Sequence, residues 1–88
     1  MSKITPITLT IAGTDIQFNP TLVAYNSYIN DLNLNDKVAP AHNYLRKIVI
    51  AEHKEALGEL LKAPGAAMQI TAKVNEVFAP DLEIEVKN

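Results

Sequence analysis

Five prolines constrain the folding of this 88-residue chain more than any other sequence feature. They are Pro6, Pro20, Pro40, Pro64 and Pro80. A proline disfavours helical backbone at the residue before it, but it fits the first turn of a helix. The last four prolines therefore predict a series of helix-sized blocks over about residues 20–79.

The block before Pro20 has the pattern of a β-hairpin. Ile7, Leu9 and Ile11 alternate with threonines, which is the period of two expected for a strand with one buried face. Residues 12–15 are typical of a turn, and residues 16–18 resume the alternation. We therefore expect a hairpin over about residues 4–18. A lone hairpin is marginally stable, so its apolar face must pack on another element.

The two blocks after Pro20 and Pro40 each predict one helix. In the first, Asn19 is expected to be the N-cap and Pro20 the first helical residue, and the helix should end near Leu32. Pro40 is expected to open the second helix. Each block has apolar residues at helical spacing. They are Leu22, Tyr25, Ile29 and Leu32, with Val23 and Tyr28 flanking, and then Ala41, Tyr44, Leu45, Ile48 and Val49.

The remaining sequence predicts two more helices and an extended end. A third helix is expected over residues 52–62, although one kinked helix continuing from the second fits the same pattern. A fourth is expected over residues 66–78, and its apolar side comprises Ala67, Ile70, Val74, Val77 and Phe78. Residues 82–86 alternate apolar and acidic side chains, which fits either a third strand or an exposed tail. We favour the strand because three strands hold together better than two.

These elements predict an α+β fold with a single domain over residues 1–88. An N-terminal β-hairpin, joined by the C-terminal strand if that strand forms, would pack on a bundle of about four short α-helices. The chain is too short for two independent cores. Its longest apolar runs are four residues, far short of the about 20 needed to span a membrane, and no secretion signal is visible. We therefore expect a cytoplasmic protein without membrane contact.

Composition argues against catalytic, metal-binding and nucleic-acid-binding functions. The chain has no cysteine and only two histidines, His42 and His53, whose spacing does not suit a metal-ligand pair on one helix face. Ser27 lacks the G-x-S-x-G context of a catalytic serine. Eight basic against ten acidic residues give a net charge of −2, with a single arginine, which is a poor match to a phosphate backbone. We predict no enzymatic activity, no cofactor and no metal.

Protein binding is the function class that these exclusions leave, and a few side chains are candidates for it. Tyr25, Tyr28 and Tyr44 are interpreted first as core or core-edge residues, with a partner-binding patch as the alternative. Met68 lies off the main apolar side of its helix, where it either fills a core gap or adapts to a partner. His42 could contact a partner or cap a helix, whereas His53 is expected to be solvent-exposed.

The middle of the sequence resembles a family of phage tail assembly chaperones. The resemblance lies in the segments KVAPAHNYL at residues 37–45, PGAA at residues 64–67 and VNEVFAPDLE at residues 74–83. The N-terminal strand pattern, which ends in AGT at residues 12–14 before Phe18, is also similar. The resemblance covers almost the whole chain, but none of its motifs is a catalytic fingerprint.

This resemblance implies a non-enzymatic protein of a long-tailed phage or prophage. Such chaperones are thought to bind the long helical tape measure protein and keep it soluble while tail tube subunits polymerise around it. They act in the host bacterial cytoplasm and are generally absent from the mature virion. The tape measure protein is therefore the expected partner, with the tail tube protein as a second candidate. A homo-oligomer is compatible with the sequence.

The expected partner surface follows from chemistry, because the family does not define individual binding residues. A chaperone for apolar helices needs an apolar patch on a soluble exterior. We place that patch at His42, Asn43 and Tyr44, with Tyr25, Tyr28 and Met68 as secondary candidates. Two alternative functions remain, a small regulatory or antitoxin-like protein-binding module and a minor structural tail component.

Overall fold

The N-terminal sequence forms the expected hairpin in the structure, a computed structural model that describes residues 6–87. Strands β1 (Ile7–Ile11) and β2 (Thr14–Phe18) pair antiparallel, with Ile11 opposite Thr14 and Ile7 opposite Phe18. Ala12 and Gly13 form the connection, with φ angles of 49° and 83°. Positive φ at both positions is the hallmark of a type I′ turn, whose twist suits two paired strands. Residues 4 and 5 of the predicted hairpin lie outside the described residues.

The outer edge of β2 is covered by the segment that follows the second helix. The Asn19 N–H donates to the Ile48 carbonyl at 2.7 Å, and the Ile50 N–H donates to the Gln17 carbonyl at 3.0 Å. His53 accepts the Gln17 N–H on its Nδ1 at 2.9 Å. The prediction of a solvent-exposed His53 is therefore wrong, since this side chain is half-buried and satisfies an edge amide of the sheet.

The first helix, α1 (Leu22–Asp31), begins later than expected. Thr21 is the N-cap, and its hydroxyl accepts the Ala24 N–H at 3.1 Å. Asn19 cannot serve as the cap because its backbone pairs with Ile48 as an extension of β2. The buried face also differs from the expectation, because Tyr28 is buried while Leu22 and Ile29 are exposed.

The second helix, α2 (Val38–Ile48), starts two residues before Pro40. This is tolerated because the first N–H groups of a helix have no partner within it. Its expected buried side is confirmed, as Ala41, Tyr44, Leu45, Ile48 and Val49 are all buried. Pairing of Val49 and Ile50 with β2 then interrupts the helical backbone, so the alternative of one long kinked helix is not formed.

The remaining helices are η1 (Ala51–His53), a single 3₁₀ turn, followed by α3 (Lys54–Leu60) and α4 (Ala66–Phe78). The bounds of α4 agree with the prediction. Gly65 precedes it with a φ of 80°, a conformation that a glycine adopts at little cost. Ala67, Ile70 and Val74 are buried as expected. Val77 is exposed, and Thr71 is buried instead.

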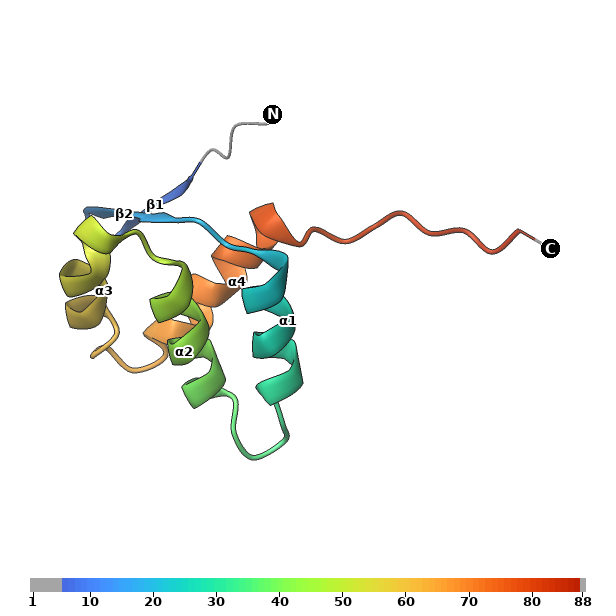
Figure 1. The fold of residues 1–88 in the computed structure, drawn as a ribbon, viewed down its shortest axis with the longest axis horizontal. Helices are drawn as coiled ribbons and strands as arrows, with labels where there is room; N and C mark the ends of the chain where they lie inside the picture. Colours follow the sequence, from blue (N-terminus) through green and yellow to red (C-terminus); the bar gives the residue numbers. More distant parts are fainter. Residues whose placement is uncertain (1–5, 88) are drawn as a thin grey trace.

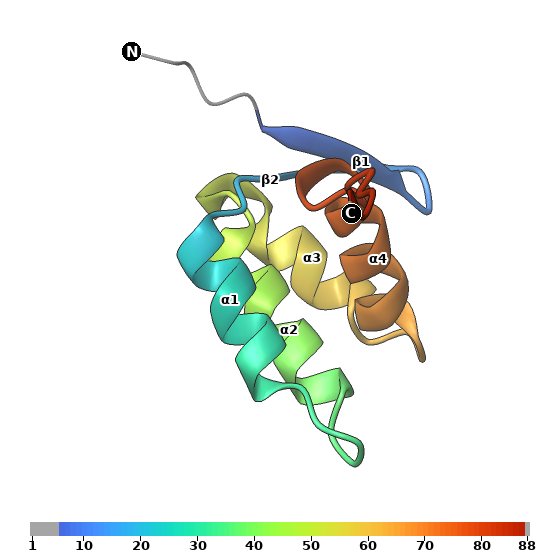
Figure 2. The same ribbon diagram turned by 90° about the vertical axis from the view of Figure 1, so that its right-hand side faces the viewer.

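All four α-helices lie on one side of the hairpin and share one core with it (Figures 1 and 2). Ile16 and Phe18 point from β2 into this core and are fully buried. The helices contribute most of the remaining buried residues of this hydrophobic cluster, and Val49 and Leu61 add to it just after α2 and α3. Helix α2 lies centrally, because it packs on both α1 and α4. The predicted α+β class is confirmed, since residues 6–87 form a two-stranded antiparallel sheet and four α-helices.

The predicted third strand does not form within residues 6–87, where the sheet has two strands. Residues 80–87 leave the end of α4 as an extended, exposed segment (Figure 1). The alternation of Leu82, Ile84 and Val86 with glutamates is typical of a strand with one apolar face. A strand also needs a neighbouring strand with which its backbone can form hydrogen bonds. In this chain the tail does not turn back to reach one.

Candidate functional site

The three candidate tyrosines meet between α1, α2 and the end of α4. The Tyr28 and Tyr44 rings stack with centroids 5.0 Å apart, and Tyr25 lies edge-on to Tyr44 at 6.4 Å. Phe78 closes the cluster at 6.0 Å from Tyr25. The Tyr44 hydroxyl donates to Oδ1 of Asn75 at 3.3 Å. Aromatic packing of this kind fixes helices relative to one another.

This packing corrects the expectation that Tyr44 contacts a partner directly. Its side chain is 1% exposed, and Tyr28 is also buried. Burial, followed by repulsion from Tyr25 and Tyr28, raises the pKa of Tyr44 to about 12. The pKa of Tyr28 is raised as well, by burial and then by Tyr25. Tyr44 and Tyr28 are therefore neutral structural groups, and of the three tyrosines only the half-buried Tyr25 reaches the surface of the cluster.

Two other candidates, His42 and Met68, come together although they are far apart in sequence. They line a hollow of about 190 Å³ between the first turns of α2 and α4, which we call the α2–α4 hollow. Val38 and Leu61 add apolar side chains to it. Val38 is 56% exposed and Met68 is 37% exposed, so apolar side chains are accessible at the rim of the hollow, beside the charged Lys62. Asn43 is exposed on α2 next to His42, but it does not line the hollow.

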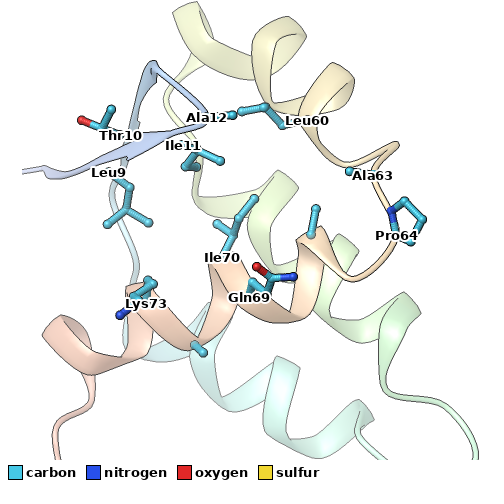
Figure 3. Close-up of a pocket in the computed structure, with 12 residues that line it drawn as sticks. Leu9, Thr10, Ile11, Ala12, Leu60, Ala63, Pro64, Gln69, Ile70 and Lys73 are labelled. Carbon is cyan, nitrogen blue, oxygen red and sulfur yellow. The ribbon is translucent and has the colours of Figure 1, made fainter.

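A larger apolar groove lies on the other side of α4, and the sequence did not indicate it. It has a volume of about 700 Å³ and runs between β1, the end of α3 and α4; we call it the β1 groove (Figure 3). Leu9 and Ile11 of β1 face Ile70 of α4 across it, while Thr10 points away. Lys73 is the one charged residue in its lining. The strand periodicity did indicate the apolar face of β1, but not that this face remains partly uncovered.

The described residues offer no constellation suited to metal binding. Within residues 6–87, no three His, Cys, Asp or Glu side chains gather closely enough to hold an ion. No helix in the same range is both long and apolar enough to cross a membrane. The α2–α4 hollow and the β1 groove, by contrast, expose apolar side chains with few charges, and such surfaces suit contact with another protein.

Comparisons with known proteins agree with this character. The family described as "Phage tail assembly chaperone" matches residues 7–88. An "Uncharacterized 11.3 kDa protein in lys 3'region" of Haemophilus phage HP1 (strain HP1c1) is 48% identical over 82 residues, which span 93% of this chain and 80% of the relative. No solved structure matches significantly. The resemblance inferred from the sequence is thus confirmed over nearly the whole length, and the chain belongs to the phage tail assembly chaperone family.

Proposed function

We propose that this protein binds the tape measure protein of its phage and keeps it soluble while the tail tube assembles. Family membership supports a protein partner in tail assembly. The observation that carries the finer proposal is the α2–α4 hollow, an accessible apolar site at the first turns of two helices. A helix with one apolar face would fit such a site, because helix-in-groove recognition depends on a few spaced apolar anchors.

The α2–α4 hollow has a chemistry suited to many similar segments rather than to one sequence. Met68 is unbranched and polarisable, so it adapts to different apolar side chains. Val38 supplies a second exposed apolar contact, and His42 supplies a polar group that can orient a partner. We propose His42, Asn43 and Met68 as contact residues, with Tyr25, Tyr28 and Tyr44 supporting the helices behind them.

The proposal includes a site of action and an absence of catalysis. We infer that the protein works in the host bacterial cytoplasm, before tail completion, and is not retained in the mature virion. We further infer that it has no enzymatic activity, because binding an apolar segment requires no reacting group. The tail tube protein is a second partner candidate.

The test is co-expression of the full chain with the tape measure protein of the same phage. We expect the tape measure protein to become soluble and to co-purify with the wild-type chain. The double variant Val38→Glu/Met68→Glu should reduce co-purification about tenfold or more, because each charge would have to be desolvated against an apolar helix.

The matched control is Val77→Glu, which changes an apolar residue of α4 that is 60% exposed but lies outside the α2–α4 hollow. This variant should retain binding. Equal loss in the control and in the double variant would reject the hollow as the binding site. A wild-type chain that leaves the tape measure protein insoluble and unbound would reject the proposed function. A His42→Ala/Asn43→Ala variant tests the polar contacts in the same assay.

A further inference from the structure

The outer edge of β1 is ready to accept another strand. In a two-residue hairpin the residues that flank the turn bond to each other, so Ile7, Leu9 and Ile11 exchange hydrogen bonds with β2. The backbone N–H and C=O groups of Thr8 and Thr10 then point away from β2. Among residues 6–87, no segment pairs with this edge. By contrast, the outer edge of β2 is covered by residues 48–50 and His53.

The β1 groove lies beneath the same free edge (Figure 3). A strand added beside β1 would extend the sheet over the groove. Every second side chain of that strand would point inward, as Leu9 and Ile11 do. The added strand would therefore gain main-chain hydrogen bonds from the edge of β1 and apolar contacts with Ile70 and Leu60 from the groove.

The C-terminal tail has the properties that this position requires. It is extended, and residues 82–86 match β1 in length at five residues. Leu82, Ile84 and Val86 are 77%, 79% and 83% exposed, so three aliphatic side chains on one face of the tail lack cover. Glu83 and Glu85 alternate with them and would face solvent.

We propose that the tail of a second copy of this chain adds to β1 as a third strand and fills the β1 groove. Within one copy the tail continues away from the body after α4 (Figure 1). Ala79 precedes Pro80, and a proline disfavours helical backbone at the residue before it. A tight reversal of the chain at Ala79 would need that helical backbone. Reciprocal exchange of two tails closes a symmetric pair and leaves no free tail. This proposal is independent of the tape measure site, which lies on the α2–α4 hollow.

Sedimentation equilibrium of the full-length protein tests the pairing. We expect a monomer–dimer equilibrium in the wild type. Ile84→Ser should raise the dimer dissociation constant about tenfold or more, because one aliphatic side chain loses its burial. The matched control Glu83→Ser changes the neighbouring, solvent-facing residue and should have a clearly smaller effect. Both residues are exposed in the single chain, so neither change should disturb its fold.

A second variant and a labelling experiment identify the acceptor edge. Thr10→Pro removes an outward N–H from β1 and should weaken the dimer, while proline at an edge strand leaves the hairpin intact. In a mixture of differently labelled copies, nuclear Overhauser contacts should link Ile84 of one copy to Leu9 or Ile11 of the other.

Three results would overturn the proposal. They are a monomeric mass up to the solubility limit, contacts between Ile84 and Leu9 only within one copy, and a dimer that Ile84→Ser leaves unchanged. Binding of the tape measure protein by Ile84→Ser should persist, so this proposal and the proposed function can fail separately.

Discussion

Alkaline pH should destabilise this protein through Tyr44. The side chain is 1% exposed, and burial together with repulsion from Tyr25 and Tyr28 raises its pKa from 10.0 to about 12. In the unfolded chain the same hydroxyl ionises near its ordinary pKa. Because the raised pKa favours the neutral form in the folded state, this contribution to stability is complete below pH 10.0 and is lost as the pH rises through about 12.

The size of the effect follows from the two pKa values. A tenfold difference in proton affinity is worth about 1.4 kcal/mol. The rise from 10.0 to about 12 therefore corresponds to about 3 kcal/mol of unfolding free energy. That is a large share of the unfolding free energy of an ordinary domain, which is about 5–15 kcal/mol. Tyr28, whose pKa is also raised, contributes with the same sign.

Urea unfolding followed by circular dichroism over a series of alkaline pH values measures this loss. Tyr44→Phe keeps the stacked ring and removes the ionisable group. At neutral pH it should cost only about 0.5 kcal/mol, because the hydrogen bond to Asn75 is a weak one. Above pH 10.0 it should lose much less stability than the wild type, whereas Tyr28→Phe should retain the loss due to Tyr44. The same pH dependence in the wild type and in Tyr44→Phe would refute the reasoning.

Two further substitutions test local features of the fold by the same urea assay. Thr71→Val should raise the unfolding free energy by about 1 kcal/mol, because the buried Thr71 hydroxyl has no hydrogen-bond partner among the described residues; a destabilised variant would indicate that the hydroxyl is satisfied. Ala12→Asn should add about 0.5–1 kcal/mol, because asparagine tolerates the φ of 49° better than alanine; no gain would argue against the type I′ turn.

The elements that the sequence predicted well are those whose periodicity is local and strong. Ala41, Tyr44, Leu45 and Ile48 lie on one face of α2 and are buried, as is Val49 directly after the helix. The bounds of α4 follow from Pro64-Gly65 before it and Pro80 after it. In both cases the residues that form the pattern lie within one turn or one helix. The prediction therefore requires no knowledge of neighbouring elements.

Two incorrect predictions, the N-cap of α1 and the exposure of His53, share one cause, which is pairing between distant segments. The Asn19 backbone bonds to Ile48, and this moves the N-cap of α1 to Thr21. The His53 ring accepts a β2 amide that lies 36 residues away. A hydrogen-bond partner at that separation leaves no local signal in the sequence.

The candidate site likewise combines residues that the sequence indicated with an arrangement that only the tertiary structure shows. Residue chemistry directed attention to the tyrosines and to Met68, but it could not show that Tyr44 is enclosed by α1 and α4. The meeting of His42 and Met68 in one hollow depends on how α2 crosses α4. The β1 groove depends on the distance between the hairpin and α4. The residue pattern of either element contains no information about that distance.

The sequence by itself determined the class of the protein, because proline spacing and apolar periodicity set the order and type of its elements, and its motifs carried the family resemblance. The tertiary structure alone decided which apolar surfaces remain uncovered. In an alternating segment such as residues 82–86, the sequence indicates which face of a strand would be apolar. It does not indicate which strand would lie beside it. Whether a strand forms depends on where the fold presents a free edge, and that is a property of packing rather than of local sequence.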